Sequence, residues 1–168
     1  MDLAEFRRAK DDFFGRAHDS PLNPEQRASF KGLSYFDEDA SLRMRVSLDG
    51  STAGGLEDVE MSDGTTQRMR RAGTLRFRIG NEDLGLTAFE QSPEELFVPF
   101  RDGTSGNESY GAGRYVEVER LPEGKWLLDF NRAYNPYCAY NENWRCPLPP
   151  RENWLAARIR AGEKVFLH

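Results

Sequence analysis

A strict alternation of apolar and polar residues in two stretches of the chain constrains its fold more than any other feature. Successive side chains of a β-strand point to opposite faces, so a period of two indicates a strand with one buried face. Both stretches place arginine on the polar face, and neither shows the i, i+3, i+4 spacing of a helix. The alternating apolar positions are Leu42, Met44, Val46 and Leu48 in the first stretch and Leu75, Phe77 and Ile79 in the second.

Weaker alternation and short apolar runs predict further strands along the rest of the chain. Turn signals such as Asp49-Gly50 and Asp63-Gly64 separate them. Short strands at this spacing, without helices between them, are typical of an antiparallel sheet. We therefore expect a mostly β fold, a single antiparallel β-barrel or sandwich with one or two short N-terminal helices. The further strands are expected at residues 59–61, 66–70, 84–89, 96–100, 115–120, 125–130, 155–160 and 164–167.

The first residues carry a different pattern, which predicts two helices. Residues 23–26, with the sequence NPEQ, have the form of a capping box with proline at the first helical position, and Gly32 suits the end of that helix. We expect residues 1–32 to form a helical lid on the sheet. The apolar residues at helical spacing in the first helix are Leu3, Phe6, Phe13 and Phe14.

The length of 168 residues fits a single domain covering residues 1–168, since domains commonly span about 100 to 200 residues. Within it we expect residues 40–168 to form the antiparallel β core, with long loops at residues 101–114 and 131–153. Loops longer than about 12 residues are uncommon in compact domains and are usually functional or disordered. The many aromatic residues of the second loop favour an ordered loop that packs over one end of the sheet.

The charge and the N-terminus indicate a location and exclude some partners. A net charge of −5 favours solubility and does not suit broad binding of polyanions. No apolar run approaches the ~20 residues that cross a bilayer. Asp2 and Glu5 stand where a signal peptide would be basic. We predict a cytoplasmic protein that binds neither membrane nor nucleic acid, and its oligomeric state does not follow from the sequence.

The loop at residues 101–114 concentrates hydroxyls, carboxylates and arginines among four glycines. Glycine lets a backbone approach a ligand and expose N–H groups that hold an anion. The spacing does not match a Walker loop, because no Gly-Lys-Ser/Thr follows. It does not match a dinucleotide fingerprint either, because a strand rather than a helix follows. The alternative is a long hairpin loop whose polar side chains bond their own backbone. The candidate ligand-binding residues here are Arg101, Asp102, Thr104, Ser105, Glu108, Tyr110 and Arg114.

A second set of candidate residues follows the strand that ends near Phe130. If Phe130 points into the core, Asp129 and Asn131 point the other way. Asp129 would then form a charged cluster with Arg101 or Arg114 across neighbouring strands. Such a cluster is either a satisfied polar network that holds the loop or part of a ligand site beside an aromatic wall. The candidate binding residues in this segment are Asp129, Asn131, Tyr134 and Tyr140.

The sequence contains two cysteines and two histidines, and these few residues limit the metal sites and the thiol reactions that are possible. A zinc site needs four suitable ligands, and no Cys-x-x-Cys pair is present, so we predict no metal site and no cofactor. A catalytic cysteine usually needs a base, and His18 or His168 would have to reach the second loop. We expect Cys138 and Cys146 to be packing residues, with a disulfide between them disfavoured in a reducing compartment.

Several longer motifs, most of them in or beside the two loops, carry a family resemblance. They are residues 97–106 (FVPFRDGTSG), 110–115 (YGAGRY), 129–140 (DFNRAYNPYCAY), 146–150 (CPLPP), 152–153 (EN) and 159–164 (IRAGEK), with 19–22 (DSPL) near the start. On these motifs nearly the whole chain resembles the domain-of-unknown-function family 1684 (DUF1684). Ser109 departs from the pattern, where we expect threonine, and keeps the hydroxyl. The resemblance implies a microbial single-domain protein, and it implies no reaction, cofactor or catalytic residue.

Three hypotheses about function follow. The first is a domain that binds a small anionic or polyhydroxylated metabolite in a cleft between the loops at residues 101–114 and 131–153. The second is an enzyme with Asp102, Glu108 or Asp129 as general base, and its mark would be a raised carboxylate pKa in a cleft. The third is a structural or interaction module without a small-molecule site, which uses exposed strand arginines. Those arginines are Arg43, Arg45, Arg68, Arg70, Arg71, Arg76 and Arg78.

Overall fold

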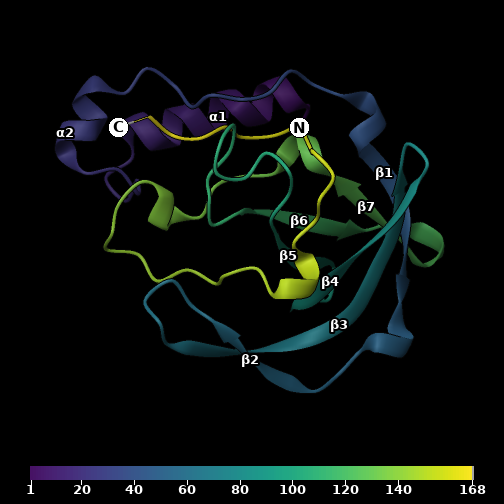
Figure 1. Cartoon of the computed structure of the whole chain (residues 1–168). Coiled ribbons are helices and arrows are strands. Elements are labelled where there is room, and N and C mark those ends of the chain that lie inside the picture. Colours follow the sequence, from purple (N-terminus) through teal and green to yellow (C-terminus); the bar gives the residue numbers. More distant parts are fainter. Residues whose placement is uncertain (168) are drawn as a thin grey trace.

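Antiparallel strands form the centre of the molecule, and they include both alternating stretches of the sequence (Figure 1). The structure is a computed structural model, and it describes residues 1–167. The strands are β1 Arg43–Asp49, β2 Leu56–Glu60, β3 Thr66–Ile79, β4 Glu82–Ser92, β5 Glu95–Phe100, β6 Arg114–Arg120 and β7 Lys125–Asp129. Six of them close a barrel in the order β1-β7-β6-β5-β4-β3, with β3 pairing back to β1. The predicted antiparallel barrel is therefore confirmed, with β2 as an extra strand.

The long strand β3 changes partners where the barrel closes. Its first half pairs with β2, outside the barrel, and its second half pairs with β4 and with β1. Gly73 lies at the change, with a φ of 148° and a shift of register toward β4. A Cβ at this position would stand 2.5 Å from the carbonyl oxygen of Asp49. The close approach of β1 and β3 therefore depends on a residue without a side chain.

The alternating apolar side chains fill the barrel. Val46, Leu75 and Val116 contribute to this core from β1, β3 and β6, and strand arginines occupy the outer face. The strands predicted at residues 155–160 and 164–167 are wrong, because both segments are irregular. Ile159 is fully buried in the barrel core, and so is Ala161. Ile159 and Ala161 are two residues apart because each makes a separate contact with the core, and the segment is not hydrogen-bonded as a strand.

Two helices precede the barrel, as predicted. α1 spans Leu3–Arg16 and α2 spans Pro24–Ser29. Asn23 and Gln26 exchange the predicted capping bonds, each 2.9 Å long. α2 ends at Ser29, before the predicted Gly32. α1 lies along one side of the barrel (Figure 1). Neither α-helix within residues 1–167 combines the length and apolar character of a membrane span.

Short 3-10 helices order the connections, including the long loop at residues 131–153. Three of them lie in or beside that loop, at Phe130–Arg132, Tyr137–Ala139 and Arg151–Asn153. Within the loop at residues 101–114, Ser105 and Ser109 form an isolated bridge that folds the segment back on itself. The remaining 3-10 helices are Ala40–Leu42, Gly50–Thr52 and Pro122–Gly124.

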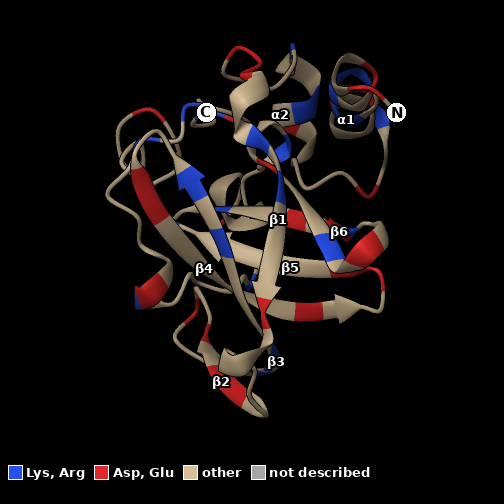
Figure 2. Cartoon of the chain, turned by 90° about the vertical axis from the view of Figure 1, so that its right-hand side faces the viewer, with Lys and Arg blue, Asp and Glu red and all other residues tan. Residues whose placement is uncertain are grey.

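The strand arginines are paired with carboxylates. Figure 2 shows basic and acidic segments side by side along the strands. Arg71 contacts Glu57 at 2.9 Å and Glu152 at 3.0 Å. Exposed pairs of this kind add little stability individually, but they reduce the free positive charge that an arginine-based interaction surface would need. The other pairs are Arg43–Asp129, Arg45–Glu123, Arg68–Asp58, Arg70–Glu90, Arg76–Asp49 and Arg78–Asp83.

Gly73→Ala is expected to destabilise the fold by about 2–4 kcal/mol, because it adds a backbone clash to a strained φ. Gly55→Ala is the matched control, since a Cβ at Gly55 meets nothing within 4 Å. Urea unfolding of both variants measures the difference. Equal stability of the two variants would show that the closure between β1 and β3 does not depend on Gly73.

Candidate functional site

Arg114, a predicted ligand-binding residue, is buried at one end of the barrel with no exposed side-chain surface. Its Nη2 donates to the Ile159 carbonyl at 2.9 Å and contacts the Asp102 carboxylate at 3.4 Å. Its Nη1 donates to the carbonyls of Ala161 and of Glu163, the latter at 3.0 Å, while its Nε is buried without a partner. Burial lowers the pKa of Arg114, and the charge of Asp102 opposes this shift.

Asp102 completes this cluster from the start of the loop at residues 101–114. Its carboxylate accepts the Ile159 N–H at 2.7 Å and the Thr104 hydroxyl at 2.9 Å. Thr104 in turn shares a hydrogen bond of 2.8 Å with Ser109, and both residues are buried. The structure thus brings Asp102, Thr104 and Arg114 together, as the sequence suggests. Their donors and acceptors are engaged with one another and with the C-terminal segment, and a ligand-binding role for them stays a prediction.

The other predicted residues of the two loops lie in separate surroundings. Arg101 stacks on Trp154 at 4.3 Å from the ring centre. Asn131 bonds the backbone of Asp39, and its partner Asp129 contacts Arg43 rather than Arg101 or Arg114. The remaining contacts are Ser105 with Asp102, Glu108 with Arg158 and Arg160, Tyr110 with Cys138, Tyr134 with Glu117, and Tyr140 with Glu163.

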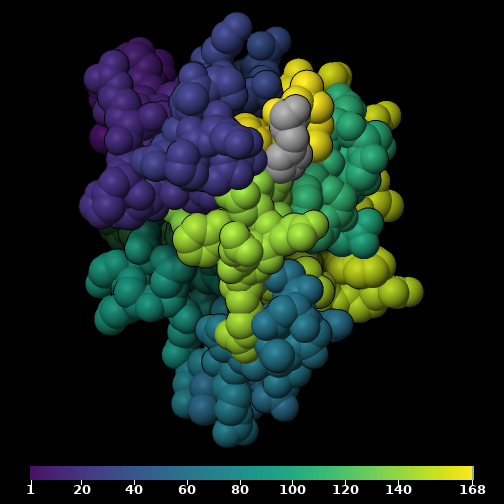
Figure 3. All heavy atoms as spheres, turned by 90° about the vertical axis from the view of Figure 1, so that its left-hand side faces the viewer, coloured from purple at the N-terminus to yellow at the C-terminus, as the bar shows by residue number. Residues whose placement is uncertain are grey.

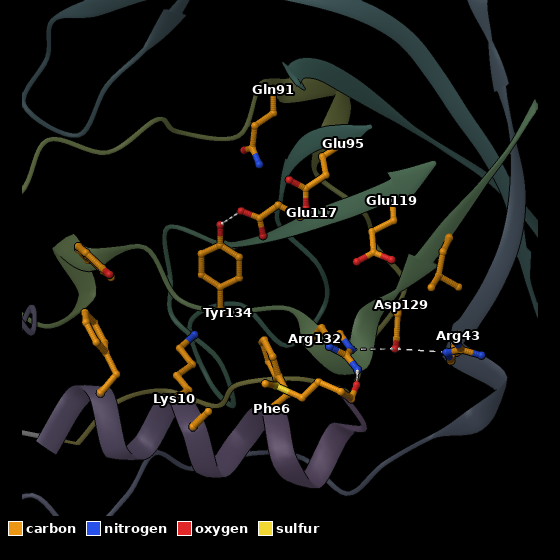
Figure 4. Close-up of a pocket in the computed structure, with 15 residues that line it drawn as sticks. Phe6, Lys10, Arg43, Gln91, Glu95, Glu117, Glu119, Asp129, Arg132 and Tyr134 are labelled. Atoms are coloured by element: carbon orange, nitrogen blue, oxygen red, sulfur yellow. Dashed lines mark hydrogen bonds and ion pairs between the residues drawn. The ribbon is translucent and has the colours of Figure 1, made fainter. Parts of the chain in front are cut away.

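A cleft of about 790 Å³ lies between α1 and the outer face of β5, β6 and β7 (Figure 4). Lys10 and Phe6 point into it from α1, and Tyr134 points into it from the start of the loop at residues 131–153. Asp129 and Tyr134 are the predicted site residues that line it. The full lining is Met1, Phe6, Ala9, Lys10, Phe13, Arg43, Gln91, Glu95, Glu117, Glu119, Leu127, Asp129, Arg132, Tyr134 and Tyr137.

Three glutamates stand together on the floor of the cleft. Glu117 and Glu119 occupy alternate positions of β6, which places both side chains on the same face. Glu95 of β5 lies directly opposite Glu119 in the pairing register. Within residues 1–167 none of the three forms an ion pair. Sequence reasoning missed them because charged residues on one strand face usually face water. One sequence signal could have identified them. Glu117 and Glu119 alternate with the apolar Val116 and Val118, on a strand that the predicted helical lid would cover.

Glu117 is half-buried and contacts a phenol. The hydroxyl of Tyr134 donates to its carboxylate at 2.5 Å. Burial raises the pKa of Glu117, and the neighbouring charge of Glu95 raises it further. Hydrogen bonds from Tyr134 and Gln91 and the charge of Lys10 oppose this shift without cancelling it. A half-buried carboxylic acid with a raised pKa in a cleft is the feature expected of a proton-transferring group.

The basic side chains around the cleft already have carboxylate partners. Lys10 forms an ion pair with the buried Glu163, and its ammonium also lies 4.6 Å from the centre of the Tyr134 ring. Arg43 and Arg132 each approach Asp129 at 3.7 Å. The free charge of the cleft is therefore negative, and its free polar atoms are mainly acceptors. Among the described residues, no cluster of three or more His, Cys, Asp or Glu has a metal-binding arrangement.

Comparisons with known proteins agree with the fold. A family model for a protein of unknown function (DUF1684) matches residues 28–164. The chain is 43% identical to an uncharacterised protein of Haloarcula marismortui whose structure was solved by solution NMR, with a TM-score of 0.71. The match covers 96% of this chain and 91% of that protein. No curated protein matches the chain. Neither match identifies a ligand or a reaction.

Arg114→Ala is expected to cost about 3–5 kcal/mol of stability, because it leaves the buried Asp102 carboxylate without its cation. Arg114→Lys keeps the charge but loses the planar fork that reaches several carbonyls, so we expect a large loss there too. Arg120→Ala, at an exposed position of β6, is the control and should change stability by less than about 0.5 kcal/mol. Urea unfolding compares the three. A loss below about 1 kcal/mol for Arg114→Ala would contradict a structural role.

Proposed function

The chain belongs to the DUF1684 family of proteins of unknown function, and from its own geometry we propose that it binds a small polyhydroxylated molecule in the cleft under α1. The observation that carries this proposal is a set of three glutamates on the floor of a cleft of about 790 Å³, none of which forms an ion pair with any residue from 1 to 167. That volume suits a sugar-sized ligand, since small-molecule sites commonly measure about 300–1,000 Å³.

The lining combines the two kinds of group that a polyhydroxylated ligand needs. Ionised carboxylates accept hydrogen bonds and donate none, so Glu95, Glu117 and Glu119 match the donors of several hydroxyl groups. Aromatic rings supply flat apolar surfaces for the carbon face of such a ligand. Phe6 comes from the helix and Tyr134 from the loop, and both line the cleft. The ligand would lie against these rings with its hydroxyls toward β6.

The charge of the cleft separates this proposal from an anionic ligand. A phosphate or carboxylate entering here would face three glutamates, while Lys10 and Arg132 are held by their own partners. Like charges at close range are unfavourable, and more so away from water. The structure thus favours the polyhydroxylated alternative over the anionic one. An anion site between the loops at residues 101–114 and 131–153 stays a prediction, and Arg114, fully buried there, is a poor donor for it.

Proton transfer by Glu117 is the second candidate function. The enzyme hypothesis requires a carboxylate whose pKa is raised in a cleft, and Glu117 meets this requirement. It replaces Asp102, Glu108 and Asp129 as the preferred general base, because those three are engaged with Arg114, Arg158 and Arg43. Tyr134 would hold the carboxyl in place through its hydrogen bond.

Neutral polyols and amino sugars are expected to raise the thermal unfolding midpoint at millimolar concentration, since a ligand that binds the native state stabilises it. The probes are myo-inositol, glucose and glucosamine, with glucose 6-phosphate as the anionic comparison. Calorimetric titration of a hit should show a loss of affinity of about tenfold or more in Glu119→Gln, because a hydrogen bond to a charged group is lost. The exposed Glu82→Gln is the matched control and should bind like the parent. If glucose 6-phosphate alone raises the unfolding midpoint, the proposed site under α1 is wrong and an anion site between the loops at residues 101–114 and 131–153 is favoured.

Glu117→Gln is expected to stabilise the protein near pH 7. The folded state raises the pKa of Glu117 above its ordinary 4.5, so the stability that its proton contributes is present below that value and is lost as the pH rises through the folded pKa. Glutamine stays neutral and avoids this loss. Urea midpoints of parent and variant from pH 4 to 8 should therefore converge at the acidic end and separate toward pH 7. A constant difference over that range would show that burial of the charge is not responsible.

A further inference from the structure

Cys138 and Cys146 lie side by side in the folded chain, although seven residues separate them in the sequence. Both belong to an apolar cluster around Phe97 and Tyr115, and their thiols hydrogen-bond each other. Both are free thiols in the structure, Cys138 half-buried and Cys146 buried. The segment between them lies on the surface between the helices and the β2–β3 hairpin (Figure 3). The pair thus joins a half-buried cysteine to a buried one.

Hydrogen-bond donors converge on the sulfur of Cys138. The hydroxyl of Tyr110 donates to it at 3.8 Å, and the Cys146 thiol donates from the other side. The Ser62 hydroxyl also lies within reach of this sulfur, with the Trp144 carbonyl at 3.3 Å as its alternative acceptor. Ser62 further accepts the backbone N–H of Cys146 at 3.0 Å, which fixes its position. Several donors around one sulfur stabilise its thiolate over its thiol.

The consequence is a division of roles between the two sulfurs. The hydrogen bond from Cys146, together with those from Tyr110 and Ser62, lowers the pKa of Cys138 to about 6 against the opposing effect of burial. The same hydrogen bond and burial raise the pKa of Cys146. Tyr115 also faces the pair, and its own pKa is raised mainly by burial. The shifts favour the thiolate on Cys138 rather than on Cys146. Of the two histidines, His18 is exposed and His168 lies outside the described residues.

We propose that Cys138 and Cys146 form a thiol–disulfide exchange site for small-molecule disulfides such as oxidised glutathione. The Cys138 thiolate attacks one sulfur of the disulfide RSSR, forms a mixed disulfide and releases RS⁻. Cys146 then gives its proton to solvent and attacks the Cys138 sulfur, which forms the Cys138–Cys146 disulfide and releases a second RS⁻. Two protein thiols are oxidised by two electrons, and RSSR is reduced to two thiols once the RS⁻ ions take up protons.

The position of the pair suits this sequence of steps. Contact between the thiols means that the second attack needs a small movement to reach the ~2.05 Å of a disulfide bond. Cys146 is covered, so the small disulfide meets Cys138 first. Tyr137, which lines the cleft under α1, precedes Cys138 in the same 3-10 helix. The cysteine pair is therefore adjacent to the proposed ligand site, but the exchange reaction does not depend on a ligand bound there.

The test uses the reduced full chain, which is incubated in its folded state at pH 7 with excess oxidised glutathione. The reaction is then quenched with acid, and the mass of the intact protein is measured by mass spectrometry. We expect the parent to lose two hydrogens, about 2 Da, and both titratable thiols. Cys146→Ser should stop at one glutathione adduct on Cys138. Cys138→Ser should remain unmodified for as long as it stays folded. A parent that keeps two free thiols, or two single variants that take up glutathione equally, would overturn the proposal.

Alkylation of the unmutated protein provides a readout that does not depend on the variants folding. Brief treatment with iodoacetamide followed by peptide mapping should place label on Cys138 at least tenfold faster than on Cys146. Between pH 8 and pH 7 the rate at Cys138 should fall by less than twofold, whereas for an ordinary thiol with a pKa of about 8.5 the rate falls about eightfold. Faster labelling of Cys146, or a fall of about eightfold at Cys138, would also overturn the assignment.

Discussion

The buried ion pair between Arg114 and Asp102 organises one whole end of the barrel. Removing a guanidinium from water costs several kcal/mol, and the cost is offset only where geometry and further hydrogen bonds are good. Here the carbonyls of residues 159, 161 and 163 accept from Arg114, and the N–H of Ile159 donates to Asp102. These are backbone groups of an irregular segment whose other backbone bonds are scattered, with one isolated bridge from Glu163 to Tyr35. The ion pair thus satisfies backbone groups that a regular ladder would otherwise bind.

Glu163 extends this cluster to the helical lid. Its carbonyl accepts from Arg114, while its carboxylate accepts from Tyr140 and pairs with Lys10 of α1. Phe14 is the buried residue of α1, and Phe6 and Phe13 line the cleft instead. Besides Phe14 and the Lys10 pair, Arg7 and Asp11 hold α1 through hydrogen bonds to residues 33–36, so much of its anchoring does not come from apolar packing on the sheet. A helix held in this manner leaves room beneath it.

The local sequence pattern was enough to predict the antiparallel barrel, but it was not enough to predict the residues of the cleft under α1. The alternation around Val46 and Leu75 depends on neighbours in the sequence, so it predicts β1 and β3 directly. The contact between Lys10 and Glu163 joins residues from the two ends of the chain, and no periodicity reports it. The charged cluster expected around Asp129 forms instead between Asp102 and Arg114, because its buried position depends on the fold of residues 159–163. Glu117 was missed because its burial comes from Tyr134 and α1, which are remote in sequence.

The contrast between paired and unpaired carboxylates is the strongest argument that the cleft has a use. On β3, Arg71 engages two glutamates, and in the loop at residues 101–114 Glu108 engages two arginines. Most acidic side chains on the strands therefore have an arginine partner, and Glu60 and Glu82, for which no pair is found within residues 1–167, are exposed. Glu95, Glu117 and Glu119 share a face without such a partner, and burial of Glu117 makes this unfavourable for folding. Carboxylates that oppose the stability of their own fold are characteristic of sites adapted to bind or to transfer protons.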